Sequence, residues 1–537
     1  TTGAQTYTGA LTIGGNSTLT GSGITTSSTT SLGANNLTLQ VNSFSFGGAF
    51  SGTGILAIAP YTVSNSMGLG SGIISTSCAG AACAMTINDA TLASLSTVGV
   101  QFGSSTTTGV IVYAPTSAPS YSNSLGFSST GGITIGGNIT TTGAQSYTGA
   151  VTIGRATTLN ASSITTSSTF GLSSNNLTLQ TNALSLGGAF SGTGAVTVQG
   201  QTTSTAMGFG SGITSTSCGG SACGLTVSDA QLNKLGTQGL TLGGAGVSGA
   251  LVYQVSSAPT YSGALTMQTT GGITLSSNVT TTGAQTYTGA LTIGGNSTVT
   301  GSGITTSSTT SLGAHNLTLQ VNSFSFGGAF SGSGVLAIAP YTPSYSIGLG
   351  SGITSTSCNG AACSMTISDA TLASLSTVGV QIGSSTTTGA IVYAPTTAPT
   401  YSGSLAFQST GGITLGGSIT TPGTQTYTGP VTLNANTTLT TTNSAIAFSS
   451  TVNGAYALTL STGTAGATLG NMGATTALTG LTVTTSGTIT LGGNVTTSGA
   501  QTYGNNVVLS ASNVALNSSS GNGAISISGT VDSAATS

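Results

Sequence analysis

Apolar and polar residues alternate along this chain over short segments, which turn-forming residues separate. Leu37–Val41 alternates strictly, and Ile55–Ile58, Val110–Tyr113 and Ala390–Tyr393 are short apolar runs rich in β-branched residues. Such segments, bounded by Gly, Asn or Pro, predict β-strands joined by turns. Because no amphipathic stretch of roughly 10 to 12 residues has helical spacing, the pattern predicts an all-β protein.

One short segment has a different pattern. Asp89–Leu95 begins with an aspartate and carries two leucines three residues apart, and it recurs as Asp229–Leu235 and Asp369–Leu375. An aspartate before a helix accepts hydrogen bonds from free backbone N–H groups and favours the positive end of the helix dipole. We therefore expect three short helical turns with Asp89, Asp229 and Asp369 as their N-caps.

The sequence repeats itself with a long, fixed period. The string Gly-Ala-Gln-Thr-Tyr-Thr-Gly at Gly3 returns with one change at Gly143, unchanged at Gly283 and in altered form at Gly423. A fixed period of this kind predicts a repeat architecture. The predicted repeats span 1–140, 141–280 and 281–420, followed by shorter, atypical repeats over 421–537. The fourth copy lacks a cysteine segment that the others share, so the long repeat is a shorter unit with an insertion.

The strand lengths predict how each repeat is built. Three strands of about five residues with short turns make a coil of about 20 residues, as in a parallel β-helix. About seven such coils would fill one repeat, and coils stack about 4.8 Å apart. The predicted fold is an all-β, parallel β-solenoid rod built from 140-residue repeats.

Charge is nearly absent. Only 2 basic and 4 acidic side chains occur among 537 residues, against 86 glycines. Several Lys or Arg contacts are needed to hold a nucleic acid backbone, so nucleic acid is excluded as a partner. Like charges on stacked coils would repel one another, whereas neutral Thr, Ser and Asn can form hydrogen-bonded ladders. No apolar run reaches the roughly 20 residues of a membrane helix, so no membrane insertion is expected.

Each of the first three copies carries one Cys-x4-Cys pair. The pairs are Cys78 and Cys83, Cys218 and Cys223, and Cys358 and Cys363. An even count at a fixed short spacing predicts local disulfides in an exported chain. Zinc would need two further ligands for each pair, and the chain has a single histidine. We expect each disulfide to fasten a protruding turn.

Catalytic machinery is not predicted. His315 is replaced by Asn in the first two copies, and Arg155 and Lys234 each occur in one copy only. The repeating aspartates would lie about 34 Å apart on stacked coils, whereas a glycosidase needs two carboxylates within roughly 5 to 10 Å. We therefore expect no enzyme, no cofactor and no metal site.

Several segments resemble the β-strand repeats of filamentous-haemagglutinin-like exoproteins and large bacterial adhesins. The segments are Gly3–Gly14, Gly52–Pro60 and the Asp-Ala-Thr-Leu-Ala-Ser-Leu segment at Asp89. This resemblance covers nearly the whole chain and implies a right-handed β-helix, export to the cell surface, and a role in adhesion or surface structure. Two departures, the lower charge and the cysteine pairs, favour a structural material over a receptor-binding adhesin. Because the chain opens within the repeat pattern, we expect a processed protein or a segment of a longer one.

Three functions follow from this fold. The first is a non-enzymatic extracellular protein that self-assembles head to tail, and laterally in bundles, into a cell-surface filament or sheath, since strand edges at the ends can template another subunit. The second is a monomeric adhesin stalk that presents a binding tip. The third is ice binding through Thr-x-Thr triplets, which is disfavoured because triplets such as Thr18–Thr20 and Thr482–Thr484 are scattered among Gly-rich coils. Sequences such as Asn16-Ser17-Thr18 leave glycosylation open.

Overall fold

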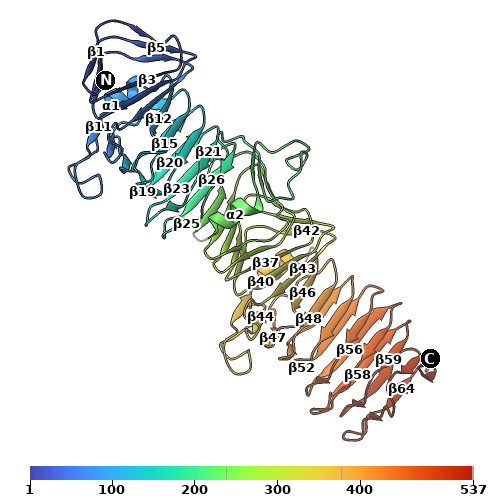
Figure 1. Ribbon diagram of the computed structural model, residues 1–537. Helices are drawn as coiled ribbons and strands as arrows, with labels where there is room; N and C mark the ends of the chain where they lie inside the picture. Colours follow the sequence, from blue (N-terminus) through green and yellow to red (C-terminus); the bar gives the residue numbers. More distant parts are fainter. Residues whose placement is uncertain (237–238, 376–377, 535–537) are drawn as a thin grey trace. The chain divides into compact units, whose positions relative to one another are not determined.

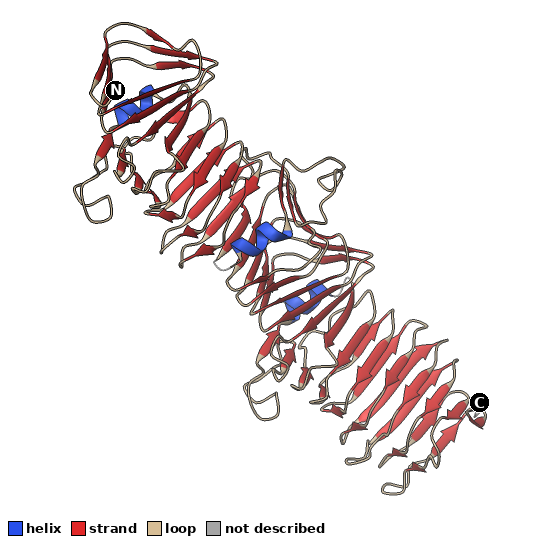
Figure 2. Cartoon of the chain, viewed as in Figure 1, coloured by secondary structure: helices blue, strands red, loops and turns tan. Residues whose placement is uncertain are grey.

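The chain folds as an all-β parallel β-solenoid with few helices, which confirms the predicted fold class (Figures 1 and 2). The structure is a computed structural model and describes residues 1–236, 239–375 and 378–534. The chain divides into two compact units: unit 1 comprises Thr1–Ile273 and Thr281–Thr288, and unit 2 comprises Thr274–Thr280 and Gly289–Ser537. Within the described ranges, no helix is long and apolar enough to cross a bilayer.

Three strands make one turn, as the first turn of unit 1 illustrates. It consists of β1 (Gln5–Tyr7), β2 (Leu11–Thr12) and β3 (Ser17–Gly21), after which β4 (Ile24–Thr26) pairs with β1 in parallel. In register, Gln5 lies opposite Ile24 and Ser17 lies opposite Leu37, so one turn takes about 20 residues. The coil length expected from the strand pattern is therefore confirmed.

Successive turns stack into long parallel sheets. The eight-stranded sheet of unit 1 contains β3, β6 (Leu37–Val41), β9 (Ile55–Ala59), β12 (Gly99–Gly103), β15 (Leu125–Ser128), β18 (Gln145–Thr148), β21 (Ile164–Thr166) and β24 (Leu184–Ser185). A six-stranded sheet of unit 2 contains β50 (Ile419–Thr421), β53 (Thr437–Thr441), β56 (Ala457–Gly463), β58 (Gly480–Thr485), β61 (Gln501–Tyr503) and β64 (Ile525–Ile527). Alternate residues such as Leu37 and Leu39 face the buried interior, and the residues between them face outward.

The cysteine segment is an insertion into one turn. Strands β9 and β12 are neighbours, with Leu56 opposite Val100, although the whole cysteine segment lies between them in the sequence. The extra chain forms β10 (Met67–Leu69), a loop, β11 (Met85–Ile87) and α1 (Asp89–Ser94). The structural unit is therefore the turn of about 20 residues, and each of the three long copies in the sequence contains one enlarged turn.

The expectation of seven coils in each long repeat is wrong. Starting at Ser17, six turns of the eight-stranded sheet lead through Leu37, Leu56, Val100, Leu125 and Gln145 to Ile164. The position equivalent to Ser17 in the second copy is Thr157, which comes before Ile164 and lies in β20 (Thr157–Ala161), a strand of another sheet. The sequence period is therefore not a whole number of turns, and equivalent strands of the first two copies lie in different sheets of unit 1.

A helix covers the end of the eight-stranded sheet. Leu186 directly follows β24, the last strand of that sheet. In α2 (Asp229–Leu235), the side-chain oxygen of Gln231 accepts a hydrogen bond from the Leu186 N–H at 2.7 Å, and Lys234 Nζ donates to the Leu186 carbonyl. An unpaired strand edge would otherwise attract another chain, so the helix acts as a cover.

The interior contains a repeated polar pair as well as apolar side chains. In each Gln-x-Tyr motif, the tyrosine hydroxyl donates to the side-chain oxygen of the glutamine two residues earlier; the pairs are Tyr7 with Gln5, Tyr147 with Gln145, Tyr287 with Gln285, Tyr427 with Gln425, and Tyr503 with Gln501. The rings also stack, with centroids 5.5 Å apart for Phe127 and Tyr147 and 4.7 Å apart for Tyr427 and Phe448. This explains why the motif recurs, since both polar groups are satisfied inside the stack.

Candidate functional site

The inserted segments of the three long copies are the first candidate sites. Each holds one cysteine pair and one aspartate, and together they hold all the cysteines and three of the four aspartates. Their loops project beside β11 and β44 (Ile347–Leu349), as Figure 1 shows for each unit. Among the residues that the structure describes, no three His, Cys, Asp or Glu side chains are close enough to hold a metal ion.

The cysteines of each copy lie at disulfide distance from each other. The S–S distances are 2.00 Å for Cys78–Cys83, 2.07 Å for Cys218–Cys223 and 2.02 Å for Cys358–Cys363. Between Cys78 and Cys83 the chain reverses, since the Cys78 N–H donates to the Ala81 carbonyl and the Ala81 N–H donates in return. The predicted local pairing therefore agrees with the geometry, and each disulfide closes a tight hairpin.

A glycine lies beneath each disulfide. A Cβ built on Gly68 would lie 2.8 Å from Cys83 Sγ, and Gly208 and Gly348 have the same relation to Cys223 and Cys363. No real Cβ tolerates so short a contact, so the sulfur occupies the space that a side chain would need. The glycine in the middle of β10 and its equivalents therefore allows the hairpin to pack directly on a strand.

The aspartates are not N-caps, which corrects the expectation for Asp89, Asp229 and Asp369. The N-cap is the preceding residue, Asn88 or Ser228, and the Asn88 side chain accepts from the Thr91 N–H. In α3 (Asp369–Leu375) the aspartate is likewise the first helical residue. The carboxylates instead accept hydrogen bonds from backbone N–H groups of neighbouring loops.

Each carboxylate ties two loops together. Asp229 Oδ1 accepts from the Ser211 N–H at 2.7 Å, while Oδ2 accepts from the N–H groups of Ser256 and Ser257 at 3.1 and 2.9 Å. Asp89 makes the same contacts with Ser71, Thr116 and Ser117, and Asp369 makes them with Ser351, Thr396 and Thr397. The Thr116 and Thr396 hydroxyls donate as well. The aspartate thus joins the start of the cysteine loop to a later turn.

For two of the aspartates, Asp369 and Asp89, these hydrogen bonds lower the pKa of the carboxyl group. For Asp369, the hydrogen bond from the Thr396 hydroxyl and those from backbone N–H groups lower the pKa from 3.8 to about 2. For Asp89, burial raises the pKa, but the hydrogen bonds from Thr116, Ser71 and Ser117 outweigh burial and the pKa is lowered. A carboxylate that stays ionised in this way can order loops but is a poor proton donor at neutral pH.

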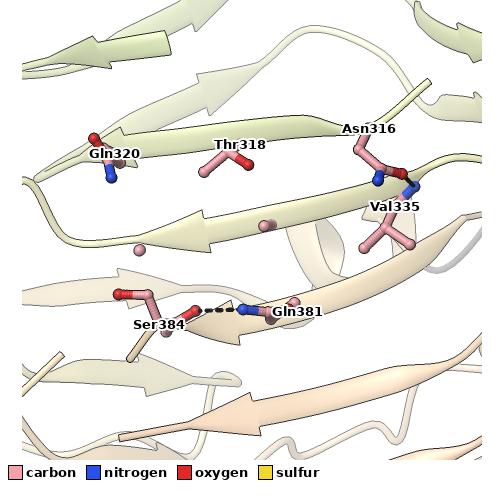
Figure 3. A pocket seen from close by; sticks show the side chains of 9 residues that line it. Asn316, Thr318, Gln320, Val335, Gln381 and Ser384 are labelled. Carbon is pink, nitrogen blue, oxygen red and sulfur yellow. Dashed lines mark hydrogen bonds between the residues drawn. The ribbon is translucent and has the colours of Figure 1, made fainter. Parts of the chain in front are cut away.

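A second candidate is a hollow on the outer face of unit 2. It lies over β40 (Leu317–Val321), β43 (Val335–Ala339) and β46 (Gly379–Gly383) and has a volume of about 200 Å³. Its lining includes the small residues Ala337 and Ala339, and Figure 3 shows Gln320 and Gln381 on different strands beside it, with Asn316 reaching the Val335 backbone. All lining groups are neutral, so the hollow can form hydrogen bonds but offers no acid or base.

This hollow was not predicted from the sequence. The signal was a difference between copies, because the second copy has Thr197 and Gln199 where the third has Ala337 and Ala339. Larger side chains at these outward positions of β26 (Val196–Gln199) leave less space above the sheet. Only the pairing of strands shows that Gln320 and Gln381 flank the same pair of alanines.

The three isolated basic residues make separate local contacts. Arg155 Nη2 donates to the Pro115 carbonyl at 3.4 Å, and Lys234 Nζ donates to the Leu186 carbonyl as described above. The His315 backbone N–H donates to the Leu312 carbonyl at 2.9 Å within a turn. The contacts of Arg155 and Lys234 are therefore with backbone carbonyls, and His315 lies in a turn as its replacement by Asn in other copies indicates.

In comparisons with known proteins, no protein-family model, no curated protein and no solved structure matches this chain. The resemblance to filamentous-haemagglutinin-like repeats therefore rests on the sequence motifs alone.

Proposed function

We propose that the chain is a non-enzymatic structural protein of the cell surface that assembles into an extracellular filament or sheath. The observation that carries this proposal is the contrast between two kinds of strand edge. Helix α2 covers the end of an internal sheet, whereas β64 and β65 (Val531–Ser533) each pair on one side only within the residues that the structure describes. Ile525 and Val531 on these strands are 41% and 52% exposed. A further solenoid turn, from a second copy or from continuing chain, would bury both side chains and complete the strand pairing.

An extracellular location and a relation to filamentous-haemagglutinin-like repeats are parts of the same proposal. Three cysteine pairs at disulfide distance suit an oxidising, extracellular setting. The sequence resemblance supports export, a right-handed winding, and the 140-residue segment as the module that was duplicated. Because the formal net charge is only −2, repulsion between neighbouring solenoids is weak and lateral bundling is favoured.

Light scattering and electron microscopy of the purified chain test the proposal. We expect concentration-dependent filaments, and we expect the double variant Ile525→Lys/Val531→Lys to shorten or abolish them, because it places charges on the edge that pairs. Ile74→Lys is the control, since Ile74 is 65% exposed on a cysteine loop of unit 1 and belongs to neither of these strands. A monodisperse monomer at high concentration would contradict assembly.

Electron microscopy of the native surface separates the proposal from the alternative of a monomeric adhesin stalk. Continuous filaments support the polymer, whereas isolated fibrils of one chain's length support the stalk. The neutral hollow over Ala337 and Ala339 is the feature of this chain that would suit a stalk binding an uncharged ligand.

A further inference from the structure

Threonine and serine side chains form a two-dimensional array on the outer face of the six-stranded sheet of unit 2. Three consecutive strands each carry two outward hydroxyl residues that flank one buried apolar residue. The triplets are Thr438-Leu439-Thr440 on β53, Thr459-Leu460-Ser461 on β56 and Thr482-Val483-Thr484 on β58. The central residues are fully buried, which fixes the direction of their neighbours.

Strand register aligns these triplets. Thr438 lies opposite Thr459, which lies opposite Thr482, so the first residues form one column. Thr440, Ser461 and Thr484 form the second column by the same pairings. Thr420 on β50 extends the second column, and Thr502 on β61 extends the first. The triplets are unevenly spaced in the sequence, which disfavoured ice binding, but they are direct neighbours in space.

The hydroxyl groups of this array are free to bind water. In the part of the chain that the structure describes, none of the eight side-chain hydroxyls donates or accepts a hydrogen bond within the protein; the eight belong to Thr420, Thr438, Thr440, Thr459, Ser461, Thr482, Thr484 and Thr502. An outer face of unit 1 differs, because its threonine column runs beside Asn160 and Gln180, whose amides bond each other at 3.1 Å. The array of unit 2 therefore presents unpaired hydroxyls and methyl groups at regular intervals.

We propose that this array is a water-ordering surface that binds ice. Neighbouring hydroxyls of a column are about 4.8 Å apart, and the two columns are about 6.7 Å apart, because these are the interstrand spacing and twice the rise per residue of a strand. These two spacings are close to the spacings between oxygen atoms on a prism face of ice. The β-branched threonine is also stiff at χ1, so the lattice is held with little loss of entropy on binding. The proposal is independent of the filament proposed above.

Thermal hysteresis and inhibition of ice recrystallisation by the full chain test the inference. We expect the wild-type chain to shape ice crystals and inhibit recrystallisation, and we expect Thr459→Tyr/Thr482→Tyr to lose both effects, because two bulky rings interrupt the central rows. The matched control is Thr414→Tyr/Thr432→Tyr, which changes two paired outward threonines on β49 (Ile413–Leu415) and β52 (Val431–Leu433) of another sheet. Both double variants should keep the far-UV circular dichroism of the wild type.

Three outcomes would overturn the inference. The first is a wild-type chain without effect on ice growth. The second is an equal loss of activity in both double variants, which would place the effect elsewhere. The third is a change of oligomeric state in Thr459→Tyr/Thr482→Tyr while neither double variant differs from the wild type in its effect on ice. That result would identify the face as a contact between copies of this chain.

Discussion

Replacement of Tyr427 by phenylalanine tests the polar pair inside the solenoid. Tyr427 and Gln425 are fully buried on β51 (Gln425–Thr428). The Tyr427 hydroxyl donates to Gln425 Oε1 at 2.9 Å, while Gln425 Nε2 donates to the Ile419 and Thr440 carbonyls at 3.2 and 2.9 Å. The substitution removes one donor and leaves a buried acceptor without its hydrogen-bond partner.

The expected loss of stability is about 1–3 kcal/mol, which is the cost of leaving one buried polar group unsatisfied. The phenylalanine ring keeps the stacking with Phe448, and the removed oxygen leaves little empty space. The double variant Gln425→Leu/Tyr427→Phe removes both partners of this hydrogen bond. Its loss of stability should therefore differ by about 0.5–3 kcal/mol from the sum of the losses in the two single variants.

Hydrogen–deuterium exchange measured by mass spectrometry is the suitable assay, because a stack of similar turns opens locally and its unfolding is not a single two-state event. A loss of about 1–3 kcal/mol corresponds to exchange that is about 5- to 150-fold faster in peptides covering β51 and its neighbours. Peptides from distant turns should exchange as in the wild type.

Tyr341→Phe is the control, since it makes the same chemical change at a residue that is 44% exposed. Equal exchange rates in Tyr427→Phe and Tyr341→Phe would refute the argument that the internal hydrogen bond stabilises the turn. Faster exchange along the whole chain would also refute it, because the effect would not be local.

Three further predictions concern the inserted segment. Cys358→Ser/Cys363→Ser should speed amide exchange in the hairpin by the equivalent of about 2 kcal/mol of loop-closure entropy while the sheets keep their protection. In the wild type, the pKa of Asp369 is lowered to about 2, so the stability that its carboxylate contributes is present above pH 3.8 and is lost as the pH falls towards 2. Asp369→Asn should therefore abolish the acid dependence of amide exchange in the loops that Asp369 joins. Gly348→Ala should cost about 1–3 kcal/mol and expose the disulfide to reductant, because the added Cβ would lie 2.8 Å from Cys363 Sγ, whereas Gly417→Ala, with open space at its Cβ position, should have little effect in the same thiol-release assay.

Local features of the fold were predictable from the sequence. Leu37–Val41 and Ile55–Ile58 were expected as strands from their patterns, and strands lie there. The pairing of Cys78 with Cys83 was also predictable, because so short a spacing brings two cysteines together without any long-range contact. The length of one coil followed from strand and turn lengths alone.

The role of the aspartates was only partly predictable. An aspartate at the start of a short helix is correct for Asp89, but its partners Ser71 and Thr116 lie in distant loops of the chain. An N-cap hydrogen bond is local, and the sequence pattern favours the local partner by default. The actual contacts depend on which turns the chain places side by side.

The amino-acid sequence by itself determined the strands, the length of a turn and the disulfide pairing, because each depends on residues that are close together in the chain. Only the tertiary structure decided the register between turns. It showed that the long sequence period is not a whole number of turns, that Gln320 and Gln381 flank one hollow, and that Thr459 and Thr482 belong to one column. Register depends on the summed lengths of all intervening loops, and one enlarged turn changes the neighbours of every residue beyond it.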